Sequence, residues 1–91
     1  MKLQPDLAQA HNDLGIALCR QGRLEEGIRQ FEQALTWRPD LPEAHSNLGV
    51  ALARQGRRDE AVRQLTEALK LRPNYPEAEQ QLRRLTGAPP P

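Results

Sequence analysis

LQPDL at residues 3–7 returns as WRPDL at residues 37–41 and as LRPNY at residues 71–75. The starting positions are 34 residues apart both times, and residues 8–41 laid over 42–75 without a gap are identical at 17 of 34 positions. A fixed period in this range is typical of proteins built from stacked repeats, each of which is one supersecondary unit. The two units are therefore expected to share one backbone conformation. No position in them is unique in the way that a catalytic residue usually is.

Size and charge narrow the possible classes of protein. The chain has 91 residues, which is one domain at most, and its net charge is +1 from 13 basic and 12 acidic residues. A protein that binds nucleic acid or a membrane surface would carry a basic excess, so neither partner is expected. The aromatic residues are too few to stack bases. The single cysteine, Cys19, rules out an intramolecular disulfide.

Targeting signals are also missing from the sequence. No apolar run approaches the length of a membrane span, and the first residues lack the apolar core of a signal peptide. We therefore expect a cytoplasmic location.

Each unit begins with the pattern of an amphipathic helix. An acid or amide stands three residues before a Gln or Glu, which is the spacing of a capping box. These pairs are Asp6 and Gln9, Asp40 and Glu43, and Asn74 and Glu77. An apolar stripe at i, i+3, i+4 and i+7 follows. Its members are Leu7, Ala10, His11, Leu14, Ala17 and Leu18, and then Leu41, Ala44, His45, Leu48, Ala51 and Leu52.

A second helix follows in each unit. Gly22 and Gly56 are expected to end the first helices in a left-handed conformation, and acids in the next turn suit the positive end of a helix dipole. Pro39 and Pro73 end the second helices. Two helices joined by so short a turn lie antiparallel, and such pairs bury both apolar sides only by stacking. A third capped helix runs from Tyr75 to about residue 85.

These residues resemble the tetratricopeptide repeat. That family has a Leu-Gly pair in the first helix, a Gly at the turn, a small and an apolar residue in the second helix, and then Ala and Pro. The matching positions are Leu14, Gly15, Gly22, Gly27, Phe31, Ala34 and Pro39, and then Leu48, Gly49, Gly56, Ala61, Leu65, Ala68 and Pro73. The resemblance implies an all-α, right-handed solenoid of two helical hairpins and a capping helix. The implied divisions are a lead-in or upstream remnant at 1–7, repeats at 8–41 and 42–75, a capping helix at 76–86 and a disordered Pro-rich tail at 87–91.

Some positions depart from the family pattern. His11 and His45 replace a bulky aromatic, and Arg58 stands where an apolar or aromatic residue is common. Gly27 stands where alanine is usual, which weakens its helix by about 0.5–1 kcal/mol. The variant looks more like bacterial arrays and the repeats of O-linked N-acetylglucosamine transferases than like chaperone-binding members.

The resemblance also implies a binding groove along the first helices. Carried over, its positions are Gln9, Asn12, Asp13, Ile16, Arg20, Glu43, Ser46, Asn47, Val50 and Arg54. Ile16 and Val50 lie roughly opposite the apolar stripe, so they either await a partner or form the rim of a wide core. Asn47 matches an asparagine that binds peptide backbone in the transferase arrays, although Asp13 breaks that series. Of the residues that capture a terminal carboxylate in chaperone-binding members only Asn47 matches, since the other positions are Asn12, Ile16, Glu77 and Gln81, so such capture is not expected.

Two other residue types invite chemical hypotheses. His11 and His45 hold equivalent positions in adjacent repeats, but no Cys or carboxylate near them completes a zinc site. Cys19 aligns with Ala53, which indicates a site for a small residue rather than a nucleophile. We therefore expect packed histidines, an inert thiol, no metal and no cofactor.

The sequence thus predicts a non-catalytic scaffold that binds a protein or an extended peptide segment. Two alternatives stay open: a substrate-recruiting repeat fragment of a larger glycosyltransferase-like enzyme, and a self-stacking unit that builds oligomers. For the last, Leu7, Ala10, His11 and Leu14 are expected to lack a covering helix, as are Leu82 and Leu85. Weak head-to-tail association between chains would follow.

Overall fold

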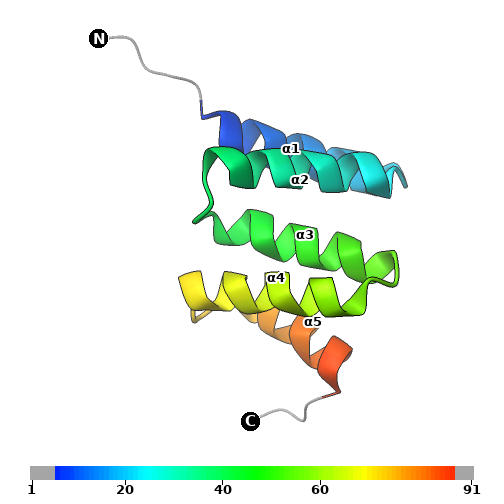
Figure 1. Cartoon of the computed structure of the whole chain (residues 1–91), viewed down its shortest axis with the longest axis vertical. Coiled ribbons are helices and arrows are strands. Elements are labelled where there is room, and N and C mark those ends of the chain that lie inside the picture. The colour runs from blue at the N-terminus through cyan, green and yellow to red at the C-terminus, as the bar shows by residue number, and fades with distance from the viewer. Residues whose placement is uncertain (1–5, 88–91) are drawn as a thin grey trace.

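The computed structural model describes residues 6–87. Most of the predicted lead-in at 1–7 and of the predicted tail at 87–91 therefore lies outside the described residues. The described part consists of five helices without a strand. They are α1 (Leu7–Arg20), α2 (Leu24–Trp37), α3 (Pro42–Arg54), α4 (Arg58–Leu71) and α5 (Pro76–Thr86). The all-α repeat fold predicted from the 34-residue period is confirmed (Figure 1).

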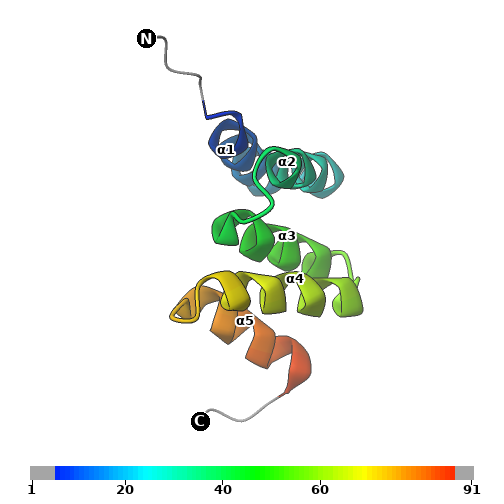
Figure 2. The same ribbon diagram turned by 60° about the vertical axis from the view of Figure 1, so that its left-hand side comes forward.

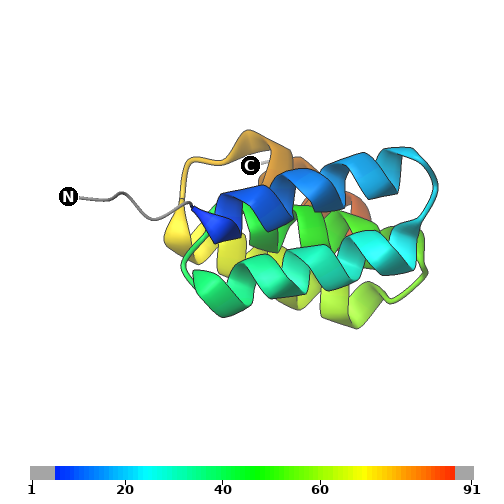
Figure 3. The ribbon, with the colours of Figure 1, turned by 90° about the horizontal axis from the view of Figure 1, so that it is seen from above.

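The helices form a stack of antiparallel hairpins. α1 packs against α2 and α3 against α4, while α2 lies on α3 and α4 lies on α5. α3 also contacts both α1 and α5, whereas α2 and α4 do not contact each other. From the side (Figure 2) and from above (Figure 3), α1 and α5 lie toward one side of the stack and α2 and α4 toward the other. α1, α3 and α5 therefore form one row of the stack, in which α1 contacts α3 and α3 contacts α5. We call these three helices the inner row.

Both hairpin turns use the same glycine geometry. Gly22 has φ +81°, its N–H donates to the carbonyl of Cys19 at 3.0 Å, and the N–H of Arg23 donates to the carbonyl of Leu18 at 2.9 Å. This pair of bonds is the Schellman motif, which satisfies carbonyls left free at a helix end. Gly56 repeats it with the same φ. The left-handed helix ends predicted from the two glycines are confirmed.

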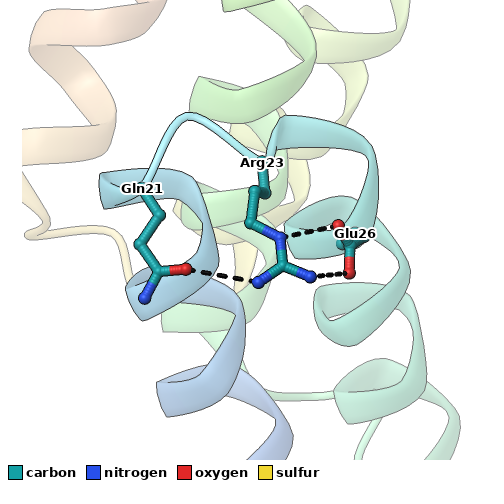
Figure 4. Close-up of polar contacts among 3 residues, drawn as sticks. All are labelled: Gln21, Arg23 and Glu26. Carbon is teal, nitrogen blue, oxygen red and sulfur yellow. Dashed lines mark hydrogen bonds and ion pairs between the residues drawn. The ribbon is translucent and has the colours of Figure 1, made fainter.

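An exposed arginine side chain links the two helices at each hairpin turn by hydrogen bonds. The guanidinium of Arg23 donates twice to the Glu26 carboxylate, at 2.7 Å each, and once to the Gln21 side chain at 3.4 Å (Figure 4). These three bonds join the end of α1 to the first turn of α2. The arginine hydrogen bonds lower the pKa of the Glu26 carboxyl. The same set of contacts recurs in Gln55, Arg57 and Glu60.

Of the predicted capping boxes, only one forms, at α1, and only its first half, because the Gln9 side chain hydrogen-bonds to Asp13 and not back to Asp6. Asp6 accepts a hydrogen bond from the backbone N–H of Gln9 at 3.2 Å, as expected of an N-cap. The predictions for Asp40 and Asn74 are wrong, because α3 and α5 begin at prolines one residue later than a box requires. Each of these side chains is then one residue too far from the free N–H groups of the first turn. The N-caps there are Leu41 and Tyr75, and neither makes a side-chain cap.

The two hairpins close tightly at Gly15 and Gly49. A Cβ on Gly15 would lie 2.5 Å from a ring carbon of Phe31 and 3.0 Å from the Gly27 carbonyl oxygen. A Cβ on Gly49 would lie 2.8 Å from the Leu65 side chain. Phe31 and Leu65 are the largest fully buried side chains. The Leu-Gly pairs therefore mark positions where one helix lies almost directly on the ring or branched side chain of the other.

Equivalent residues of α1 and α3 differ in burial. Leu14 is 48% exposed, whereas Leu48 is 4% exposed because Ile28 and Phe31 of α2 pack against it. No described helix covers the corresponding face of α1. The exposed members of its predicted stripe are Leu7, Ala10, Leu14 and Ala17, and its buried face is Ala8, Asn12, Gly15 and Leu18.

The last helix is fixed to the second hairpin. Ala78 is fully buried against Leu65 and Ala68 of α4, and Leu82 and Leu85 pack half-buried on the same cluster. The Arg58 guanidinium donates to the carbonyl of Leu85 at 2.6 Å. This bond explains the departure from the family pattern at position 58, because a long cation there satisfies a free carbonyl at the end of α5. Within residues 6–87 no helix has the length and apolar character needed to cross a membrane.

Candidate groove on the inner row

A shallow hollow of about 150 Å³ lies between α1 and α3 on the inner row. Its lining is mainly apolar with polar groups at the edge. The lining residues are Ile16, Cys19, Arg20, Phe31, Asn47, Val50, Ala51 and Arg54.

Half of the candidate groove residues meet at this hollow. They are Ile16, Arg20, Asn47, Val50 and Arg54. Ile16 also packs against the core cluster beneath, so it is both core rim and groove wall. Sequence reasoning missed Cys19, Phe31 and Ala51 as lining residues. These three residues have the pattern of residues packed between helices, and that pattern predicted burial in the core without exposure to a groove.

Asn12 and Asn47 bond to each other across the inner row. The Asn47 amide donates to the Asn12 side-chain oxygen at 3.0 Å, and Asn12 is only 2% exposed. The candidate position Asn12 is therefore a buried link between the repeats rather than an open contact. Asn47 also lines the hollow.

The other candidate residues lie away from the hollow. Gln9 and Asp13 are exposed on α1 and hydrogen-bond to each other at 3.0 Å. Glu43 approaches Arg72 at 3.8 Å. Ser46 is 4% exposed, and its hydroxyl hydrogen-bonds to Tyr75 at the start of α5. The structure thus divides the ten candidates into five around the hollow, two exposed on the first turns of α1 and three held in contacts between helices, which are Asn12, Glu43 and Ser46.

The electrostatics of the hollow come from one thiol and two guanidinium groups. Burial raises the pKa of the Cys19 thiol, and the nearby positive charge of Arg54 opposes that shift. A raised pKa keeps the thiol neutral at pH 7, which weakens it as a nucleophile. Arg20 and Arg54 are exposed and form no hydrogen bond or ion pair with any residue in the 6–87 range.

Both histidines bridge the two helices of their own repeat. His11 Nδ1 lies 2.7 Å from the Gln30 side-chain oxygen, and His45 Nδ1 lies 2.8 Å from that of Gln64. His45 Nε2 also hydrogen-bonds to the carbonyl of Pro39 at 2.8 Å. No cluster of three or more His, Cys, Asp or Glu side chains in the described part could hold a metal ion.

The fold and the repeat geometry define the class of this chain. The tetratricopeptide repeat profile matches residues 6–74. The chain belongs to the tetratricopeptide repeat family, as its Leu-Gly, turn-glycine and alanine positions predicted. No curated protein matches the sequence.

Several solved structures share the fold. The second tetratricopeptide domain of Spaghetti (RPAP3), bound to the HSP90 peptide SRMEEVD, has a TM-score of 0.87 at 18% identity over 89% of this chain and 75% of that one. The first such domain of Spaghetti, with the same peptide, also has a TM-score of 0.87, at 21% identity over 92% of this chain and 67% of that one. The second domain of human RPAP3, in complex with the HSP70 peptide SGPTIEEVD, has a TM-score of 0.83 at 22% identity over 87% and 66%.

Proposed function

We propose that this chain is a non-catalytic scaffold that binds an extended segment of a partner protein along its inner row. The observation that carries the proposal is the hollow between α1 and α3, which joins apolar walls to the half-buried Asn47 and to the exposed guanidinium groups of Arg20 and Arg54. Apolar walls with a few polar groups at the edge are typical of ligand sites. The three solved structures named above support it, since their domains have this fold and hold peptides.

The absence of chemistry is part of the proposal. Among the residues that line the hollow, the only nucleophile is Cys19, and its pKa is raised by burial. The lining contains no carboxylate or imidazole that could act as its general base. The cytoplasmic location and the finer resemblance to bacterial or transferase arrays stay predictions. The sequence of the native gene around this segment would test the latter.

A peptide-array screen with paired variants tests the binding surface. Val50→Glu places a charge in the wall of the hollow, whereas Val62→Glu makes the same change on the outer helix α4. We expect Val50→Glu to lose the peptides that the wild-type chain retains, and Val62→Glu to keep them. Circular dichroism shows whether both variants remain helical. If folded Val50→Glu keeps every wild-type peptide at equal strength, the inner row is not the binding surface.

Self-stacking is a second candidate, favoured by the uncovered face of α1. Leu14 is 48% exposed, although its counterpart Leu48 lies under α2. A helix from a second chain could cover this face as α2 covers α3, and such a head-to-tail contact would build open chains. Light scattering of a concentration series would show a mass that rises in the wild type and stays monomeric in Leu14→Glu. A constant monomer mass for both proteins would exclude this candidate.

A further inference from the structure

One end of the stack presents an uncovered apolar face on α1. Seen from above, no described helix lies over α1 (Figure 3). Four apolar residues on this face are exposed, and we call them the α1 seam: Leu7, Ala10, Leu14 and Ala17. Their equivalents in α3 are all buried in the contact with the first repeat, and they are Leu41, Ala44, Leu48 and Ala51. The same pattern is thus covered in one repeat and open in the other.

The α1 seam has the spacing of two packed helices. Leu7 and Leu14 are seven residues apart, and an alanine follows three residues after each. Residues at this heptad spacing form the contact between two helices that cross at about 20°. In α3 the equivalent residues pack on α2, which runs antiparallel to α3 (Figure 1). The open seam is therefore suited to an antiparallel helix.

The other end of the stack does not supply that helix. α5 stands where a third repeat would begin, and Arg83 falls at the position of Gly15 and Gly49. Even a Cβ on Gly49 would lie 2.8 Å from the Leu65 side chain, so the arginine keeps any further helix from packing on α5 as α4 packs on α3. Arg83 pairs instead with Glu79 at 2.8 Å, and no large hydrophobic residue of α5 is exposed. A head-to-tail contact would set this polar surface against the apolar seam.

The α1 seam is complementary to itself when two copies of α1 meet antiparallel. A two-fold axis level with Asn12 sets Leu7 opposite Ala17 of the second copy, and Ala10 opposite Leu14. Each layer then joins one large and one small side chain, an alternation that fills the space between packed helices. A parallel pair would set leucine against leucine and leave gaps between the alanines.

Charges beside the seam fit the same arrangement. Asp6, Asp13 and Arg20 follow one another at seven-residue intervals along one edge of the seam, and all three are exposed. In the antiparallel pair Arg20 of each copy lies near Asp6 of the other, where it adds a second cation to a carboxylate that already pairs with Arg38 at 2.9 Å. The two Asp13 side chains meet beside the axis. The pair thus has two attractive contacts and one repulsive contact at known positions.

We propose that the α1 seam is a homodimer interface, in which two copies of this chain pack their α1 helices antiparallel about a two-fold axis. The same surface serves both copies, so the assembly is closed. The inference deepens the self-stacking candidate, replaces its open chains by a closed pair, and does not depend on peptide binding at the hollow. One helix face per copy is small beside a standard interface of about 1,600 Å², so the dimer is weak and forms at high protein concentration.

Sedimentation equilibrium of the full chain from micromolar to millimolar concentration gives the stoichiometry. We expect the apparent mass to rise to twice the chain mass and to level off there. A mass that keeps rising beyond the dimer would overturn the closed pair and favour open chains. A constant monomer mass would exclude both forms of self-association, and neither result would affect the proposed peptide groove.

Asp13→Asn tests the two-fold axis. The substitution removes the like-charge contact and keeps an acceptor for Gln9, so the dissociation constant of the dimer should fall by roughly twofold to fivefold. Asp59→Asn removes the same charge from an exposed position on the outer helix α4 and should leave the dissociation constant near that of the wild type. Equal effects of the two substitutions would mean that Asp13 does not face its own copy, and the proposed pairing would be wrong.

Chemical cross-linking tests the register. In the Cys19→Ala background, which removes the only native thiol, Asp13→Cys places one thiol of each copy beside the axis. A short bis-maleimide should then link two chains rapidly, whereas Glu67→Cys on the exposed side of α4 should remain largely monomeric at the same concentration. If Asp13→Cys cross-links no faster than Glu67→Cys, the α1 helices do not pair in this way, even where the chain dimerises through another surface.

Discussion

The first repeat contains a compensating pair that the second repeat lacks. A Cβ on Gly27 would overlap the Sγ of Cys19 and lie 3.0 Å from the Gly15 carbonyl oxygen. The equivalent residues in the second repeat are Ala53 and Ala61, and Ala61 is fully buried. Cysteine with glycine in one hairpin and alanine with alanine in the other are two ways to fill the same space.

Gly27→Ala in the wild-type chain is therefore expected to destabilise it. Replacing a mid-helix glycine by alanine gains about 0.5–1 kcal/mol in helix propensity. The overlap with Cys19 forces a side-chain or backbone shift that costs roughly 1–3 kcal/mol. The overlap outweighs the propensity, so the net loss is about 0.5–2 kcal/mol. For a domain of this size that loss lowers Tm by roughly 2–16 °C, at about 4–8 °C per kcal/mol.

The sign should reverse when Cys19 is first shortened. In the Cys19→Ala background the overlap with the sulfur is gone, and the hairpin has the two alanines that the second repeat accommodates at Ala53 and Ala61. Gly27→Ala should then stabilise the chain by about 0.5–1 kcal/mol. Thermal and urea unfolding of the four proteins, followed by circular dichroism, gives the interaction free energy directly. We expect about 1–3 kcal/mol. If Gly27→Ala changes the free energy of unfolding equally in both backgrounds, Cys19 and Gly27 do not compensate each other.

Three further changes test separate contacts. Gly49→Ala should lower the free energy of unfolding by about 1–3 kcal/mol in urea, because its methyl group meets the Leu65 side chain; unchanged stability would show an open position. Arg58→Gln should speed amide hydrogen exchange in α5 and not in α1, since the carbonyl of α5 loses its donor; equal exchange would mean that the bond contributes nothing. Hydrogen bonds from arginine lower the pKa values of Glu26 and Glu60 in the folded chain below the usual value of 4.5. The two ionised carboxylates therefore stabilise the folded state above pH 4.5, and this stabilisation is lost as the pH falls through the lowered pKa. A variant with both as Gln should unfold more readily than the wild type at pH 7 and equally at low pH, and an unchanged difference across that range would contradict the assignment.

The helices were predictable because their signals are local. Gly22 fixes a left-handed turn, Pro39 ends a helix, and the Leu-Gly pair marks a close approach, whatever the rest of the chain does. The failed caps at Asp40 and Asn74 are local as well. At each of these sites the sequence contains two helix-start signals, a capping side chain and a proline two residues later. The helix begins at the proline.

The candidate groove was predictable only in part, because burial depends on neighbours that a single repeat does not contain. Ser46 aligns with Asn12, and both were assigned to an open groove. Ser46 lies under Tyr75, and Asn12 is held by Asn47, so each is buried by the repeat that follows it. The reverse holds for Leu14, which has the sequence of a core residue and no described helix over it.

Departures between the two repeats are therefore the most informative positions in the alignment. Where the repeats agree, as at Gly15 and Gly49, the sequence reports what the fold requires of every copy. Where they differ in pairs, as at Cys19 and Gly27, it reports a contact across the hairpin, because a gain in volume on one helix is matched by a loss on the other. Where one residue differs between the repeats and no second difference in the same hairpin compensates for it, the residue that it contacts lies outside that hairpin. Arg58 is such a case, and the carbonyl that it binds lies in α5.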